Sequence, residues 1–402
     1  MTHSSLNSIL ISPSPRGGGF RVKGVRVMGA LELFPLRVAK GKRFCNRELE
    51  KKFLKDCIEQ KKPTVLISPR RYGKTSLANK VVDDLKRPFC SVDFLTTYDD
   101  LSICHSIVKG VSELISQIMP INMKTVSLIE KCFRGVKAAI RYKSIELEFS
   151  APLEKIDPIQ QVLETLNGLE KLGEKLNKSV VIFIDEFQRI LETPKGDAIQ
   201  GMIRHVAQST AHIAFLFSGS SRHMLSQIFD DSNMPLYMMC EKFYLGRIAS
   251  PHYMHYIQEA ALIKWKTKIS ENIIERILKL TENHPFYVNY LCNQLWQKST
   301  LPTEEGEVDT AWEECFLSEE RRFVTELEQL TINQRLLLKE VANTPNLLEP
   351  TSTTFLSKIA LSSGTVIPIL KTLSNKDLIF IDDQKVTRVL DPLLKYMLIK
   401  GI

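Results

Sequence analysis

The sequence predicts an α/β fold with a parallel sheet, followed by a helical region and a small domain of three helices and a hairpin. Two observations predict the sheet: a strand, turn and helix at residues 64–78, and an apolar strand ending in two carboxylates at 185–186. Alternation of strands and helices between these motifs is typical of α/β sheets. The helical region is predicted because strand patterns fade after Pro251.

Residues 64–78 have the chemistry needed to hold phosphate groups. The apolar strand 65–67 leads into the basic turn SPRRYGKT, and a helix follows. In such a turn, backbone N–H groups and the helix N-terminus face the phosphates, a lysine (Lys74) reaches the β and γ oxygens, and a hydroxyl (Thr75) binds magnesium. The pattern G-x-x-x-x-G-K-[ST] would place glycine where this chain has Ser68. A plain basic turn between strand and helix is the alternative.

Residues 180–186 form the second motif. Five consecutive apolar residues precede Asp185 and Glu186, as in a buried parallel strand whose carboxyl end presents catalytic groups. We expect Asp185 to share a hydrated magnesium ion with Thr75, and Glu186 to polarise the attacking water. A strand that ends in a solvated acidic turn is the alternative, and the Gly-Lys-Thr turn upstream argues against it.

A further buried strand, 213–217, ends in a polar turn that begins with Ser218. A polar side chain beside the phosphate site can sense the γ-phosphate or position water, so Ser218 is a candidate catalytic residue. Arg204 and Arg222 are candidates for stabilising transition-state charge, in cis or across a subunit contact. Arginines near helix ends are more often solvated or ion-paired, which is the alternative for both.

Composition and charge exclude several classes of function. The longest apolar runs fall far short of the ~20 residues that cross a bilayer. The eight cysteines include no C-x-x-C pair, so we expect buried thiols in a reducing cytoplasm rather than disulfides or zinc ligands. Residues 1–43 carry eight basic residues against one acidic residue. The net charge of +8 is therefore poor evidence that the folded body binds nucleic acid.

The chain is too long for one compact core, and changes in its composition and residue pattern divide it into domains. Residues 1–39 are predicted to be a disordered basic extension, because 1–27 are rich in Ser, Pro, Gly and Arg. A basic arm for nucleic acid is the alternative there, and Met28 is an alternative start. The other domains are predicted as an α/β domain at 40–247, a helical lid at 248–330 and a winged helix at 331–402.

Periodicity places the elements along the chain. The first helix is predicted to bury positions 49, 53, 54, 57 and 58, with Asn46 as its cap, and Asp157 is predicted to cap a later one. A second strand is predicted at 88–94 and a short strand or hairpin at 142–149. The other predicted helices cover 77–85, 101–119, 157–176, 252–263, 270–280, 285–299 and 307–330.

The last part of the chain has winged-helix spacing. Helices are predicted at 332–341, 355–361 and 365–373, with a turn at 362–364 and a hairpin at 378–390. The helix 365–373 would be the recognition helix. Its exposed face has few cations, Lys371 and Lys376, and no cluster of Arg, Asn or Gln faces base edges. DNA contact and protein docking are therefore both open.

With these pieces in order, the chain resembles the bacterial and archaeal AAA-type ATPases, relatives of the replication-initiator and STAND signalling ATPases. The resemblance covers residues 40–400. It rests on Phe44-x-Asn46-Arg47-Glu48-x-Glu50, SPRRYGKTS at 68–76, Ile184-Asp185-Glu186-Phe187, Phe217-Ser218-Gly219-Ser220, His284-Pro285-Phe286-Tyr287 and Leu390-Asp391-Pro392-Leu393.

This resemblance implies a P-loop sheet of the additional-strand type, with ATP and Mg2+ as ligands. The motifs at 68–76 and 184–187 correspond to Walker A and Walker B. Residues 44–50 would lie along the adenine, and the lid would touch the nucleotide at His284 and Pro285, after Asn283 where the family often has glycine. The expected nucleotide contacts are Phe44, Arg47, Ser68, Pro69, Arg70, Arg71, Tyr72, Gly73, Lys74, Thr75, Ser76, His284 and Pro285.

The leading hypothesis is a cytoplasmic ATPase of low turnover, a switch in which Mg-ATP closes the lid and changes what the winged helix presents. Its expected partners are DNA or a protein at the winged helix, without a membrane, and a second copy in a nucleotide-dependent homo-oligomer. The first alternative is a DNA-binding protein in which ATP is a structural or regulatory ligand. The second is a scaffold that never binds nucleotide, because Ser68 replaces glycine.

Overall fold

The computed structural model describes residues 33–39, 41–120, 122–133, 136–141, 144–149, 157–381 and 384–401. Most of the expected basic extension, including the alternative start Met28, lies outside the described residues. Residues 33–39 were expected to belong to that extension. They are described, and they pack against the rest of the chain.

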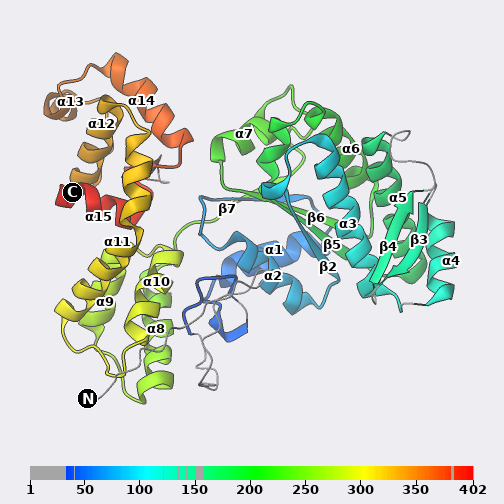
Figure 1. The fold of residues 1–402 in the computed structure, drawn as a ribbon, viewed down its shortest axis with the longest axis horizontal. Helices are drawn as coiled ribbons and strands as arrows, with labels where there is room; N and C mark the ends of the chain where they lie inside the picture. Colours follow the sequence, from blue (N-terminus) through cyan, green and yellow to red (C-terminus); the bar gives the residue numbers. More distant parts are fainter. Residues whose placement is uncertain are drawn as a thin grey trace, which may run out of the picture. The chain divides into compact units, whose positions relative to one another are not determined.

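A parallel sheet of five strands confirms the predicted fold class (Figure 1). Across the sheet the order is β2 (Phe89–Asp93), β5 (Val180–Asp185), β6 (Ile213–Gly219), β1 (Thr64–Ile67) and β7 (Glu241–Tyr244). Strand β6 separates the two strands that carry the motifs, as the resemblance to AAA-type ATPases implied. Strand β7 was not predicted, because its four residues are partly exposed and lack an apolar run.

Alternate side chains of the strands pack on opposite faces of the sheet. Val65, Ile182 and Phe215 share a core with α3 (Asp100–Ile118), α5 (Pro158–Leu176) and α6 (Gly196–Ser209). Leu66 and Phe183 share another core with α1 (Glu48–Glu59) and α2 (Lys74–Leu85). The sheet therefore lies between two helical layers, and parallel pairing brings the carboxyl ends of β1, β5 and β6 to one edge.

The predicted starts of two helices can be compared with the structure. Asp157 caps α5 as predicted, because its carboxylate accepts a hydrogen bond from the Ile159 N–H at 3.2 Å. The predicted cap of α1 is wrong: α1 begins at Glu48 with Arg47 at the N-cap position, and Asn46, one residue earlier, accepts from the Glu48 N–H at 3.3 Å. The predicted apolar face of α1 is wrong at Leu49, which is 82% exposed.

The middle of the chain matches the prediction at its hairpin and in its helical region, but the helices at 123–132, 196–209 and 222–230 were not predicted. Helix α4 (Met123–Cys132) precedes an antiparallel hairpin of β3 (Val136–Arg141) and β4 (Ser144–Phe149), near the predicted hairpin. Helix α7 (Arg222–Asp230) follows β6. The helical region consists of α8 (Ser250–Trp265), α9 (Glu271–Thr281), α10 (Pro285–Trp296) and α11 (Glu305–Glu328), at the four predicted positions.

The predicted winged helix has its three helices and its hairpin. They are α12 (Ile332–Asn343), α13 (Thr353–Ile359), α14 (Ser363–Asn375), β8 (Ile379–Ile381) and β9 (Thr387–Val389), and α15 (Pro392–Lys400) follows. The turn predicted at 362–364 is wrong: Ser362 caps α14, which begins there. Helix α15 was not predicted, although Asp391 caps it. The helical region and the winged helix share one hydrophobic core.

Among the described residues, no single helix is long and apolar enough to cross a membrane. Helices α13 and α14 pass the same test of length and composition only as a pair, with an 82° bend between them. All eight cysteines carry free thiols.

Candidate functional site

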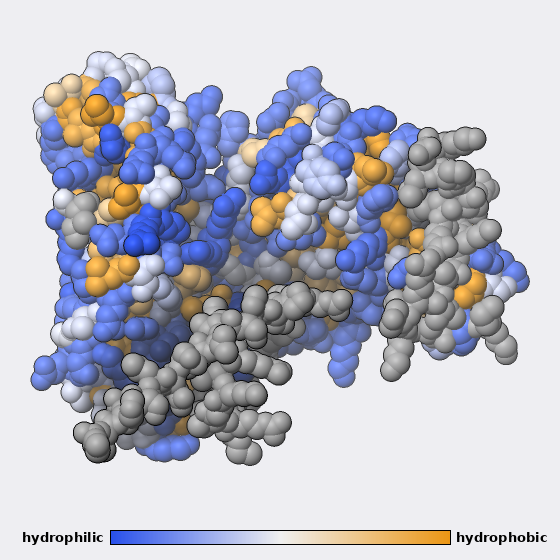
Figure 2. Space-filling model, viewed as in Figure 1, coloured by the Kyte–Doolittle hydropathy of each residue, from blue (hydrophilic) through white to orange (hydrophobic). Residues whose placement is uncertain are grey.

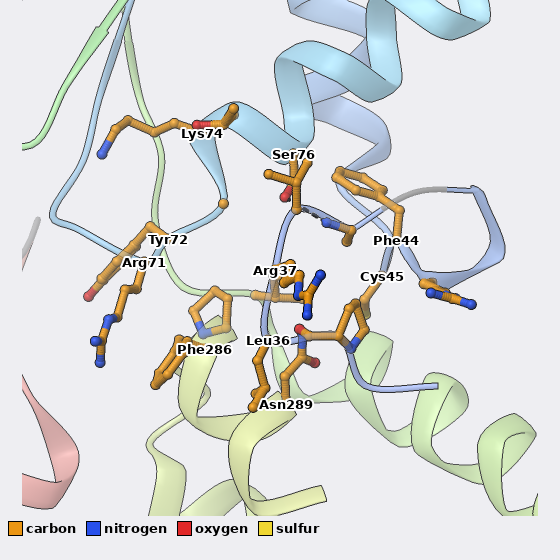
Figure 3. A pocket seen from close by; sticks show the side chains of 18 of the residues that line it. Leu36, Arg37, Phe44, Cys45, Arg71, Tyr72, Lys74, Ser76, Phe286 and Asn289 are labelled. Atoms are coloured by element: carbon orange, nitrogen blue, oxygen red, sulfur yellow. Dashed lines mark hydrogen bonds between the residues drawn. The ribbon is translucent and has the colours of Figure 1, made fainter. Parts of the chain in front are cut away.

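A cavity of about 440 Å³ lies at the carboxyl edge of the sheet (Figure 3). Five parts of the chain line most of it: Pro35–Ala39, residues 43–47 in part, the turn Arg70–Ser76, Asp185 with Glu186, and Pro285, Phe286 and Asn289 at the start of α10. Figure 3 shows Lys74 and Arg71 on one side of the cavity, with Phe44 and Cys45 on the other. One end of the cavity lies at the motifs predicted to hold phosphates, and we call it the phosphate end, with residues 68–76 as the phosphate turn. The second end is lined by residues 35–39, 43–47 and α10, and we call it the base end.

The backbone conformation of the turn explains why serine is tolerated at position 68, where the motif has glycine. The left-handed residues of the turn are Arg71 (φ 66°) and Gly73 (φ 91°), and Ser68 is not among them. Serine at position 68 therefore causes no backbone strain, whereas Gly73 takes a conformation that favours glycine. The Ser68 side chain is buried and does not line the cavity, and neither does Pro69.

Lys74 lies in the first turn of α2 and is 6% exposed. Its ammonium donates hydrogen bonds to the carbonyl oxygens of Ser68 at 2.9 Å and Pro69 at 3.2 Å. Burial lowers the pKa of Lys74, and the nearby carboxylates of Glu186 and Asp185 oppose that shift. The positive charge of Lys74 is therefore held inside the turn, and Lys74 also lines the cavity.

Thr75 and Asp185 meet as the sequence predicted. The Thr75 hydroxyl donates to Asp185 Oδ2 at 2.7 Å, and both residues line the cavity. Ser218, a predicted catalytic residue, is fully buried, donates to Asp185 Oδ1, and does not line the cavity. A hydroxyl beside a carboxylate is a set of hard oxygen donors, which fits Mg2+.

Glu186 also lines the cavity. Its Oε2 accepts hydrogen bonds from Gln188 Nε2 at 2.6 Å and from the Ser220 hydroxyl at 2.7 Å. Burial would raise the pKa of Glu186, but these bonds and the charges of Lys74 and Arg70 outweigh it, so the pKa lies below its ordinary value. The carboxylate is therefore ionised near neutral pH.

Residues 33–39, which we call the strap, form one wall of the base end. Phe34 is 1% exposed in the core of the helical region. The Asn289 amide donates to the Pro35 carbonyl at 2.9 Å, and the Ala39 N–H donates to the Ser76 hydroxyl at 3.0 Å (Figure 3). Sequence reasoning missed the strap, although the apolar run within LFPLRV was a signal in an otherwise basic segment.

Phe44 and Arg47, which were predicted to contact the nucleotide, both line the cavity, but the Arg47 side chain already has partners within the protein. The guanidinium of Arg47 is 4% exposed and donates to the carbonyls of Tyr72 at 3.1 Å and Gly246 at 2.9 Å, and to Glu50. Arg47 therefore joins α1 to the phosphate turn and to the segment after β7. Phe44 packs only partly against the core.

His284, another predicted contact, does not line this cavity, whereas Pro285 does. The imidazole caps α10 by accepting from the Phe286 N–H at 3.2 Å and lies edge-on to Tyr72, with ring centroids 4.7 Å apart. Burial holds the pKa of His284 well below its usual range, and the charges of Arg247 and Arg71 act in the same direction. A neutral His284 supports the phosphate turn through Tyr72.

The two candidate arginines also lie outside the cavity. Arg204, in α6, donates to the Pro235 carbonyl. Arg222 begins α7, and its guanidinium lies 5.9 Å from the ring centroid of Phe380 in the winged helix. Neither is placed to touch a ligand in this cavity within one chain.

Comparison with known proteins agrees with this architecture. Residues 321–400 match a family described as a probable winged helix domain. A Walker-type ATPase of Pyrococcus abyssi superposes with a TM-score of 0.68 at 16% identity, covering 91% of this chain and 99% of its own. The ORC2 protein of Aeropyrum pernix, solved with ADPNP and ADP, gives 0.54 at 16% identity, covering 88% and 92%. No curated protein matches the sequence. The chain therefore has the fold of the Pyrococcus abyssi Walker-type ATPase and the Aeropyrum pernix ORC2 protein, and its residues 321–400 match a winged helix domain.

Proposed function

We propose that the chain binds ATP with Mg2+ in this cavity and hydrolyses it slowly. The observation that carries the proposal is the 2.7 Å contact of Thr75 with Asp185 beside the buried Lys74 and the ionised Glu186. A cation, an oxygen pair and a carboxylate that can accept a proton are what phosphoryl transfer to water requires. The nucleotides bound by the Aeropyrum pernix protein support this choice of ligand.

The residues present define the proposed chemistry. A water oxygen forms a bond to the γ-phosphorus as the bond between that phosphorus and the β,γ-bridging oxygen breaks, and the electron pair leaves with ADP. Glu186 accepts the proton of the attacking water and returns it to the phosphate product. Lys74 offsets the charge on the phosphates, and Thr75 with Asp185 would hold Mg2+, which supplies further charge neutralisation when bound.

We propose further that nucleotide state is coupled to the winged helix through Arg247. Its guanidinium donates to the Tyr72 hydroxyl at 3.3 Å, to Glu282 at 2.7 Å and to the Leu390 carbonyl at 3.2 Å. One side chain thus contacts the phosphate turn, the helical region and the end of the hairpin of the winged helix. A shift of the turn on ATP binding would change all three contacts.

The partner of the winged helix is proposed to be a protein. Figure 2 shows hydrophobic residues on the surface where α13 and α14 lie in Figure 1. In α14, Ile367 is 58% exposed, and the exposed cation in the middle of the helix is Lys371. Base readout in DNA relies on Arg, Lys, Asn and Gln side chains, and in the middle of this helix Lys371 is the single residue of these types.

Single-turnover hydrolysis of radiolabelled ATP tests the proposed activity. The wild type should release phosphate, and Glu186→Gln should lose at least about a hundredfold in rate while keeping its ATP affinity, since general-base catalysis contributes that much. Glu192→Gln is a matched control on the surface of the same loop, where Glu192 pairs with Arg189. Equal rates for the wild type and Glu186→Gln would contradict the assignment.

A further inference from the structure

Glu186 is held by two donors that the proposed chemistry has not used. Both the Gln188 amide, at 2.6 Å, and the Ser220 hydroxyl, at 2.7 Å, bind the same oxygen, Oε2. Within the described part of the chain, Oε1 accepts no side-chain hydrogen bond. One carboxylate oxygen is therefore fixed by the protein, and the other is left for a ligand in the cavity.

Burying Gln188 beside Glu186 costs free energy. It lies in the short 3-10 helix Phe187–Glu192, is 4% exposed, and its own Oε1 is buried without a partner among the described residues. A buried amide with an unsatisfied oxygen costs free energy that an apolar side chain of the same size would not. Because a carboxylate only accepts hydrogen bonds, the amide must present its N–H to Glu186.

The neighbouring strand makes room for this amide. A Cβ on Gly219, in β6, would lie 2.0 Å from Gln188 Oε1. Glycine at that position therefore lets the Gln188 amide approach the end of β5. Gly219 lies between Ser218, which binds Asp185, and Ser220, which binds Glu186.

We propose that Gln188 is a positioning residue for hydrolysis, which together with Ser220 fixes Glu186 Oε2 so that Oε1 faces the attacking water. This inference rests on the proposed function. Gln188 acts only through Glu186, so it affects the rate of the chemical step and leaves nucleotide binding unchanged. A role in packing alone would instead lower stability whichever residue occupies position 186.

A double-mutant cycle separates these roles, with Gln188→Met keeping the volume of the side chain. We expect single-turnover hydrolysis to fall by about tenfold in Gln188→Met, with ATP affinity unchanged, and no further fall when the change is added to Glu186→Gln. Gln161→Met is the matched control: Gln161 is 2% exposed in α5, in the same domain, and does not contact Glu186.

Several outcomes would overturn the inference. They are wild-type hydrolysis in Gln188→Met, an equal loss in the Gln161→Met control, or the same tenfold loss in the Glu186→Gln background. If Gln188→Met fails to fold, Ser220→Ala takes its place in the cycle, with the same expected result. Absence of hydrolysis in the wild type would overturn the proposed function and this inference together, whereas an active wild type with a normal Gln188→Met overturns the inference alone.

Discussion

The two ends of the cavity are built in different ways. The phosphate end consists of two short motifs, at 68–76 and 185–186, which are joined by the hydrogen bond of Thr75 to Asp185 and by the opposite charges of Lys74 and Glu186. The base end consists of the strap, residues 43–47 and α10, which lie far apart in the sequence. Neutral side chains hold the strap there by donating to its backbone carbonyls. Local chemistry thus makes one end, and tertiary packing makes the other.

This difference predicts how each end responds to change. Losing a charge at the phosphate end should affect any ligand that carries phosphates. Losing a neutral hydrogen bond at the base end should affect only ligands that carry a base, and by less, because neutral hydrogen bonds contribute less than charged ones.

The largest effect is expected for Lys74→Ala. Removing the ammonium should cost about 3 kcal/mol, about a hundredfold in affinity, for ATP and for inorganic tripolyphosphate alike. Titration calorimetry with both ligands measures this. Lys80→Ala is the control, because Lys80 pairs with Asp84 on the same helix. Tripolyphosphate that binds Lys74→Ala as it binds the wild type would place the phosphates elsewhere.

Asn289→Leu should have a smaller and more selective effect. It removes the 2.9 Å hydrogen bond to the Pro35 carbonyl and so loosens the strap. We expect ATP affinity to fall by about tenfold and tripolyphosphate affinity to stay unchanged. Gln294→Leu, in the same helix, is the control, because the Gln294 amide donates to Glu314 at 2.9 Å. An equal loss for both ligands would mean that the two ends are not separable.

Asp377→Asn tests the charge of the phosphate end without any ligand. Burial raises the pKa of Asp377 to about 6, although Arg70 and Lys74 oppose the shift. The folded state therefore holds this proton more tightly than the unfolded chain does, so stability falls as the pH rises from the ordinary pKa of 3.8 to about 6, and the full cost remains at higher pH. The neutral variant should be more stable by about 1 kcal/mol at pH 7.5 and equal to the wild type at pH 4. Thermal unfolding of the wild type and the variant at the two pH values tests this prediction. A variant less stable than the wild type at pH 7.5 would contradict it.

Tyr256→Phe should have the smallest effect. Its hydroxyl shares one proton between the carbonyls of Leu33 at 2.6 Å and Arg43 at 3.1 Å, so its loss should cost about 1 kcal/mol of stability. Because these bonds are neutral, the cost should be the same at pH 7.5 and pH 6, as measured by chemical denaturation. Tyr244→Phe, at an exposed position, is the control. A cost that changes with pH would show that charge also stabilises the base end.

The sequence was informative where chemistry is local. The phosphate turn, the contact of Thr75 with Asp185 and the cap of α5 each depend on neighbouring residues or on one strand edge, and all were predicted. The strap was not predicted, because Phe34 is buried only by helices more than two hundred residues away. The sequence could not show that Ser218 contacts Asp185 and Ser220 contacts Glu186, because these pairings depend on how the end of β6 lies against β5.

Amide hydrogen exchange with and without Mg-ATP tests the central claim, that both ends belong to one nucleotide site. We predict that Mg-ATP slows exchange together in the strap, in residues 70–76 and at the start of α10, and that Lys74→Ala abolishes all three effects. Protection confined to 70–76, or none in any of these segments, would contradict it.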